Sequence, residues 1–413
     1  MASSAPPTYH RHPPSGITSN ALAPSSLPWY IGTPLSLLST AVYIAILPAY
    51  LAYQTAIYYT IGPPWPGWSL GTMLFTRGLR LLLQFMFRFG LPRADRNAWK
   101  VPIGARQKGV DVECRRIAGI PKEEEDELRI GWARQESVKV VEVPGFMLWP
   151  ETRKNGFANG NASKAQSSAF TGSGYALANE GEKIVYYLVG GGYISGHPLR
   201  THLAWTTSQQ LHVRVFAVNY RKSLTIDTSF PACLLDALAG YLYLTRELGF
   251  QPSNIILMGD SAGGNLCLGL ARYLGELAER SQREEIKKIG QVGGMILYSD
   301  YPTAFGDSGV LSHARHFPKH LASPYFSPSL PTSDGSPRFR HLKDAGTKVY
   351  IQTGTAEILY DEDVQLANGM RDEGVDVRLR ELEGEVHAAI LFKRKKAMVA
   401  NDKDLFEFWD SLS

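Results

Sequence analysis

The residues with the clearest capacity for chemistry are residues 259–263, Gly-Asp-Ser-Ala-Gly. An apolar run at 254–258 precedes them, and apolar residues at helical spacing follow as far as 278. A strand, a sharp turn centred on serine and a helix form the context of a nucleophile elbow. Glycines two residues to either side of Ser261 leave room for such a turn. Ser261 is therefore the candidate nucleophile, and a chance turn between strand and helix is the alternative.

A serine hydroxyl needs a base to take its proton and an acid to orient that base. The candidate base is His387, which follows an expected strand at 376–382. The candidate acid is Glu357, which lies just past an expected strand at 348–353. Asp361 and Glu362 are rivals, although they also suit the N-cap and first turn of the helix that follows.

A glycine-rich segment could supply the donors that stabilise an oxyanion. Residues 189–193, Val-Gly-Gly-Gly-Tyr, lie at the end of an expected strand at 184–189, and three glycines leave backbone N–H groups unobstructed. A phosphate-binding loop is the alternative, but no Gly-Lys-Ser/Thr follows.

The elements that must position these residues alternate between strand and helix from residue 183 onward. Such alternation predicts an α/β fold with a mostly parallel sheet and helices on both faces. Further strands are expected at 138–143, 213–219 and 294–299, and helices at 231–248, 262–278 and 362–373. Residues 153–182 read as a surface insertion that carries a glycosylation sequon at Asn161.

The N-terminal third of the chain differs from the rest in composition and in its content of charged residues. Residues 1–29 are rich in Ser, Pro and Ala and are predicted to be disordered. Residues 30–62 are predicted to form a transmembrane helix, because they lack charge and contain an apolar stretch long enough to span a bilayer. A buried helix of an N-terminal cap is the alternative.

A second helix is expected at 69–90, where four polar residues share one face: Arg77, Arg80, Gln84 and Arg88. A basic, aromatic-rich amphipathic helix is typical of a membrane interface, and packing on its own domain is the alternative. Residues 91–135 are expected to form a cap or linker, and 136–413 the catalytic domain.

Composition and charge narrow the classes of partner and of metal or disulfide site that we expect for this chain. The chain has 413 residues and a net charge of +4, but eight basic residues and only one acid fall within 77–108, so residues 109–413 carry a net negative charge. Nucleic acid is therefore not an expected partner of the main domain. Three widely spaced cysteines suggest neither a metal site nor a disulfide framework.

From about residue 183 to 391 the chain resembles the hormone-sensitive-lipase-like branch of the α/β-hydrolases, which includes fungal carboxylesterases and arylacetamide deacetylase. The resemblance rests on a series of motifs in the family's order: Gly190-Gly191-Gly192-Tyr193, Asn219-Tyr220-Arg221, Phe230-Pro231-Ala232, residues 259–264, Ser323-Pro324-Tyr325, Glu357 and His387.

The resemblance implies an α/β-hydrolase fold with an N-terminal cap over the site. It assigns Ser261 as nucleophile, His387 as base and Gly191, Gly192 and Ala262 as oxyanion donors, and it supports Glu357 as the acid; Tyr193 is expected to bind substrate. There are two departures. Val189 stands where the family usually has a histidine that braces the loop, and the acid is Glu where the family usually has Asp.

The function expected from these features is a membrane-anchored serine ester hydrolase, a carboxylesterase or deacetylase, that acts on a small lipophilic ester and needs no cofactor or metal. One alternative is a secondary-metabolism enzyme that hydrolyses, cyclises or transfers an acyl group, and another is a hydrolase fold that only binds a ligand. A single-pass location in the endoplasmic reticulum membrane is expected. The positive-inside rule favours a cytosolic catalytic domain, whereas relatives in that membrane often face the lumen.

Overall fold

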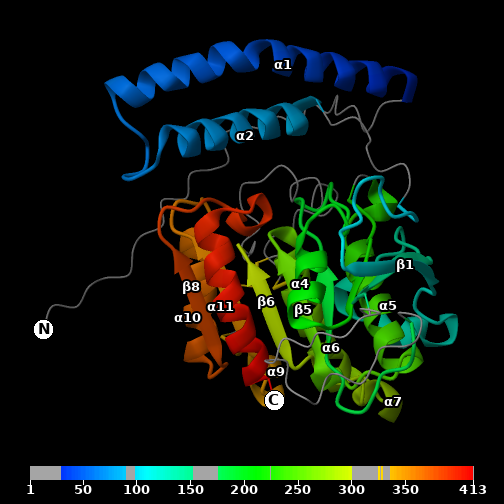
Figure 1. Ribbon diagram of the computed structural model, residues 1–413. Helices are drawn as coiled ribbons and strands as arrows, with labels where there is room; N and C mark the ends of the chain where they lie inside the picture. Colours follow the sequence, from blue (N-terminus) through cyan, green and yellow to red (C-terminus); the bar gives the residue numbers. More distant parts are fainter. Residues whose placement is uncertain are drawn as a thin grey trace, which may run out of the picture.

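The computed structural model describes residues 29–89, 98–151, 175–223, 225–299, 324–325, 327–328 and 335–412. An eight-stranded sheet forms its centre, and two long N-terminal helices lie across one end of it (Figure 1). The predicted disordered tail, Asn161 and most of the predicted 153–182 insertion lie outside the described residues.

The strands follow the order β1-β2-β4-β3-β5-β6-β7-β8 across the sheet. The pairs β1–β2 and β2–β4 are antiparallel, and every other neighbouring pair is parallel. Their bounds are β1 Val110–Ile117, β2 Val143–Pro150, β3 Ile184–Leu188, β4 Val215–Val218, β5 Ile255–Asp260, β6 Gly294–Tyr298, β7 Lys348–Gly354 and β8 Val377–Leu382.

The central strands are buried along their whole length. Every residue of β3, β4, β5 and β6 is buried, as expected of parallel strands covered by helices on both faces. In the edge strand β8, by contrast, only Leu382 is buried, and the other residues are exposed or partly buried. The strand β5, which leads to Ser261, therefore lies in the fully buried centre of the sheet.

Helices connect and cover the strands. Within the catalytic part they are α3 Glu125–Leu128, α4 Leu203–Leu211, α5 Ala232–Leu242, α6 Ala262–Arg280, α7 Glu284–Lys287, α9 Arg340–Ala345, α10 Tyr360–Asp372 and α11 Lys395–Ser411. A π-helical turn, Tyr243–Glu247, extends α5, and a 3-10 helix, Ala389–Phe392, precedes α11. A hydrogen bond from the side chain of Gln210 to that of Asp402 joins α4 to α11. The helices α5 and α6 pack against one another.

The two N-terminal helices, α1 (Trp29–Thr60) and α2 (Leu70–Phe89), form a hairpin that we call the N-terminal hairpin. They pack along one another, with Gly78 of α2 facing Leu47 and Leu51 of α1. Residues Leu37–Thr60 are long and apolar enough to cross a membrane, and only 11% of their most apolar window is buried. This exposure does not fit the alternative of a buried helix of an N-terminal cap.

Two expectations about the sheet were wrong. Residues 110–117, assigned to a cap or linker, form the edge strand β1, whose charged Arg115 and Arg116 obscure its apolar alternation. The strand expected at 138–143 is instead the approach to β2, which begins at Val143. The pairing of β1 with β2 ties residues N-terminal to 136 into the sheet.

Candidate active site

Ser261 occupies a sharp turn between β5 and α6. Its φ of 50° and ψ of −125° are unfavourable for a residue with a side chain, and such strain is typical of functional turns. A Cβ on Gly263 would lie 2.0 Å from the carbonyl oxygen of Leu188, and one on Gly259 would lie 2.4 Å from the backbone of Gly263. Glycine at both positions therefore allows the backbone to fold tightly enough to expose the serine hydroxyl.

Three side chains from distant parts of the chain meet at this turn. The Oγ of Ser261 lies 2.9 Å from Nε2 of His387, and Nδ1 of His387 lies 3.2 Å from Oε2 of Glu357. The carboxylate can accept only from an Nδ1–H, which leaves Nε2 free to accept the serine proton. The geometry thus fits a nucleophile, a base and an orienting acid.

The carboxylate of Glu357 is fully enclosed, with a side chain that is 0% exposed. Burial raises the pKa of Glu357, but hydrogen bonding and charge from His387, followed by bonds with Thr353 and Asp363, outweigh it and lower the pKa below its usual 4.5. Glu357 is therefore ionised at neutral pH. Its rival Asp361 is exposed in the first turn of α10.

The loops that carry the acid and the histidine are hydrogen-bonded to one another. The backbone N–H of Ala356 donates to Glu385, and that of Gly384 donates to the hydroxyl of Thr355. After the histidine, the N–H of Ala388 donates to the hydroxyl of Ser299 at the end of β6. These bonds fix the separation between Glu357 and His387.

The glycine loop follows β3 beside the serine. Gly191 and Gly192 have φ values of 115° and 60°, which favour glycine, and Ala262 begins α6 directly after Ser261. The expectation that Tyr193 binds substrate is not supported, because its side chain is 3% exposed and its hydroxyl donates to Asn265 of α6 at 2.5 Å. Tyr193 holds the loop against α6.

Other contacts brace this loop where the family's histidine is replaced by Val189. The hydroxyl of Tyr220 donates to the carbonyl of Val189 at 2.6 Å. The buried carboxylate of Asp260 accepts from the Tyr187 hydroxyl at 2.5 Å and from the backbone N–H of Gly190. Burial raises the pKa of Asp260, and these two bonds oppose that shift.

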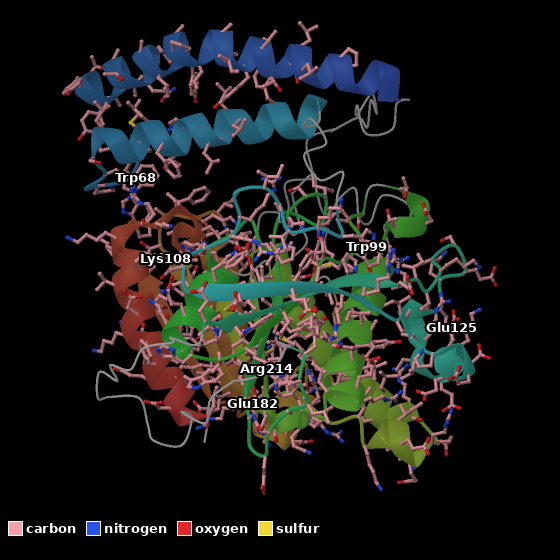
Figure 2. The ribbon with its side chains drawn as sticks, turned by 45° about the vertical axis from the view of Figure 1, so that its right-hand side comes forward. Trp68, Trp99, Lys108, Glu125, Glu182 and Arg214 are labelled. Carbon is pink, nitrogen blue, oxygen red and sulfur yellow. The ribbon has the colours of Figure 1, made fainter. Side chains whose placement is uncertain are left out.

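The N-terminal hairpin contacts the histidine loop directly. The indole Nε1 of Trp68 donates to the carbonyl of Gly384 at 2.7 Å, and Met73 and Val386 complete a small apolar cluster with it. Trp68 lies at the turn of the hairpin, on the side that faces the catalytic domain (Figure 2). The helices that lie over the site are thus attached within three residues of His387.

A model of the α/β hydrolase fold family matches residues 185–391, which is half of the chain and contains all three residues of the triad geometry. The chain belongs to the α/β-hydrolase family. The prediction of this fold from the sequence is confirmed. The order of Ser261, Glu357 and His387 along the chain is the order in which α/β-hydrolases carry nucleophile, acid and histidine.

Individual relatives agree with this membership. The chain is 28% identical to the ethyl acetate hydrolase of Pseudomonas putida over 218 residues, which is 49% of this chain and 64% of that protein. It is 32% identical to mouse hormone-sensitive lipase over 90 residues, or 21% of this chain and 12% of that protein, which supports the predicted branch. The chain thus spans a little under two thirds of the first of these relatives.

Solved structures agree on the fold. Carboxyl esterase 2 from the fungus Tuber melanosporum superposes with a TM-score of 0.54 at 15% identity, over 79% of this chain and 94% of that one. At this identity the likeness concerns the fold alone.

Several residues of this α/β-hydrolase site were not identified from the sequence. Thr353 donates to Oε1 of Glu357, Trp68 supports the histidine loop, and Tyr187 supports Asp260. Of these supporting residues, only Asp260 could have been identified from the sequence, because it lies inside the elbow motif. The contacts of Trp68 and Tyr187 span 316 and 73 residues of sequence, so no local pattern announces them.

Proposed function

We propose that this α/β-hydrolase is a serine carboxylic-ester hydrolase that acts on a small lipophilic ester. The observation that carries the proposal is the unbroken line of hydrogen-bonding groups from Ser261 through His387 to Glu357. Relatives named as hydrolases and esterases support the same reaction class.

In this proposal Ser261 attacks the ester carbonyl as Nε2 of His387 takes its proton. The tetrahedral oxyanion is stabilised by the backbone N–H groups of Gly191, Gly192 and Ala262, near the positive end of α6. His387 then protonates the leaving alcohol, and the same residue activates the water that hydrolyses the acyl-enzyme. Glu357 remains ionised throughout and stabilises the imidazolium.

Hydrolysis of p-nitrophenyl esters from acetyl to decanoyl tests the reaction. The full chain in detergent should hydrolyse at least one ester and label with a fluorophosphonate probe, because both require an activated serine. The acyl chain length of the ester that is hydrolysed fastest would indicate the length of the acyl-binding site. A folded protein that neither hydrolyses any ester nor labels would refute the proposal.

We also propose that the N-terminal hairpin anchors the enzyme in a membrane, in the setting of the endoplasmic reticulum that the resemblance implies. Large apolar side chains along α1 are more than half exposed, among them Leu38 at 61%, Ile44 at 62% and Tyr53 at 62%. Exposed apolar surface of this extent is costly in water and favourable in lipid.

Because the N-terminal hairpin contacts the loop that carries His387, a membrane anchor would also affect how substrate enters the site. Trp68 and Met73 pack against Val386, immediately before His387, so the membrane elements and the site form one unit. A lipophilic ester dissolved in the bilayer would reach the site without crossing bulk water.

The anchor can be tested without disturbing this attachment by substituting exposed residues of α1. Leu38→Lys with Ile44→Lys should release the protein from vesicles in a flotation assay, since two lysines cost roughly 5 kcal/mol of insertion. Hydrolysis of soluble p-nitrophenyl acetate should remain, while that of a long-chain ester held in vesicles should fall.

The matched control places two lysines on exposed apolar residues of the catalytic part, Leu177→Lys and Val399→Lys, which are 71% and 61% exposed. The control should still float with vesicles. Unchanged flotation of the α1 variant would contradict the membrane anchor and would leave the proposed ester hydrolysis unaffected.

A further inference from the structure

The helix α1 of the N-terminal hairpin has one packed face and one exposed face. Residues that are at least partly buried recur along it at helical spacing: Tyr43, Leu47, Tyr50, Gln54 and Ile57. Residues on the opposite face are exposed and recur every seven positions: Leu38, Ala45, Ala52 and Tyr59. Seven residues are close to two helical turns, so these four side chains form a straight row roughly 32 Å long. We call this row the outer row of α1.

The packed face of α1 is covered by α2 along much of its length. A Cβ on Gly78 of α2 would lie 3.7 Å from a methyl carbon of Leu51 and 3.9 Å from one of Leu47. Further along, the rings of Tyr43 and Phe85 have centroids 5.8 Å apart. The two helices therefore run antiparallel in contact, with α2 between α1 and the catalytic domain (Figure 1).

The first two turns of α2 are fixed to the catalytic domain. Arg394, at the start of α11, donates from Nη2 to the hydroxyl of Thr72 at 3.2 Å. The ring of Phe75 packs edge-on against Phe392, with centroids 5.0 Å apart. Together with the bond from Trp68 to Gly384, these contacts hold both helices across the end of the sheet, beside the loop that carries His387 (Figures 1 and 2).

A hairpin packed in this way places charge beside the middle of α1. Leu47 and Leu51 lie near the centre of the apolar stretch Leu37–Thr60. If α1 crossed a bilayer with α2 still packed on it, Gly78 would lie near the bilayer midplane. Arg77 and Arg80 would then lie within about 3 Å of that depth along α2. Charged side chains at the centre of a bilayer are costly, so the packed hairpin disfavours a crossing orientation.

We propose that α1 lies in the plane of the membrane surface, with its outer row against the acyl chains of one leaflet and α2 on the aqueous side. The proposal rests on the proposed membrane anchor and specifies its geometry. Packed helices are separated by roughly 8–10 Å, so α2 and its exposed Arg80 would lie outside the hydrocarbon. The alternative is the single-pass orientation that the sequence led us to expect.

The depth of α1 is measured by fluorescence quenching on the full chain in phosphatidylcholine vesicles. Single cysteines are introduced along the outer row by four separate substitutions: Leu38→Cys, Ala45→Cys, Ala52→Cys and Tyr59→Cys. Each is labelled with a small fluorophore and quenched by lipids that carry spin labels at shallow or deep acyl positions. A Cys114→Ser background removes the one native thiol that is partly exposed, because the other two cysteines are buried.

In the proposed orientation the four labels should lie at the same distance from the bilayer centre, to within about 5 Å, as for a helix in the membrane interface. A crossing helix would instead place the labels at Leu38 and Tyr59 about 10 Å farther from the centre than those at Ala45 and Ala52. That pattern would overturn the in-plane orientation and leave the membrane anchor standing. No quenching at any of the four positions would overturn both.

The matched control is Leu177→Cys in the same background, which labels an exposed apolar residue of the catalytic part. Its label should not be quenched by either lipid. Quenching of this control to the same extent as the outer row would overturn the proposal, because it would show that the chain adsorbs to vesicles without a preferred face. Thermal unfolding of each labelled variant checks that it is folded, and none of these measurements depends on ester hydrolysis.

Discussion

Replacement of Ser261 by alanine should abolish ester hydrolysis, with a fall in kcat on the order of 10⁴-fold or more. The Oγ of Ser261 lies 2.9 Å from Nε2 of His387, and alanine removes this one atom, so the histidine loses the hydroxyl that it would activate. Steady-state hydrolysis of the best p-nitrophenyl ester measures the loss, and fluorophosphonate labelling should disappear with it.

Structure should survive this substitution, because alanine removes one atom from a side chain at the edge of the turn. The unfolding temperatures of Ser261→Ala and wild type should therefore agree. Any increase in the unfolding temperature of the variant would reflect removal of the contact between the serine Oγ and His387. Retention of more than about a tenth of the wild-type rate would be incompatible with nucleophilic catalysis by Ser261.

Replacement of Glu357 by glutamine should lower kcat roughly 10⁴-fold, the scale of loss when an orienting carboxylate becomes an amide. The amide nitrogen of glutamine would favour the wrong histidine tautomer, because it would donate to Nδ1 and shift the proton to Nε2. Measurement of kcat and KM separately should show the loss in kcat.

Asp361→Asn is the matched control, since it makes the same chemical change four residues away on an exposed carboxylate. Its rate should stay within about twofold of wild type, as for most surface substitutions. Loss of activity in Asp361→Asn with retention in Glu357→Gln would transfer the orienting role to Asp361.

Acid sensitivity offers a second readout for Glu357. Its pKa is lowered in the folded state, so the ionised carboxylate contributes stability that is present above the unfolded pKa and is lost as the pH falls through the lowered folded value. Wild type should lose this contribution below pH 4.5, and Glu357→Gln should lack that part of the pH dependence in urea unfolding.

The elbow and the sheet could be predicted because their causes are local. Glycine at 259 is required by the backbone of Gly263 within the turn, although glycine at 263 is required by Leu188 of β3; both positions are marked by the short motif around Ser261, and the buried strands consist of continuous apolar runs. The edge strand β1 escaped prediction because two successive arginines face solvent at a position where half of the strand is uncovered.

The candidates and their order could be read from local patterns: Ser261 in a glycine-flanked turn, Glu357 after β7 and His387 after β8. These follow from short-range sterics and from the rule that parallel strands end at the same edge. Only the tertiary structure separated Glu357 from Asp361, because burial against His387 and Thr353 depends on how two loops cross. It likewise turned Tyr193 inward to Asn265 and brought Trp68 onto Gly384, since hydrogen bonds across 72 and 316 residues arise only when separate elements pack.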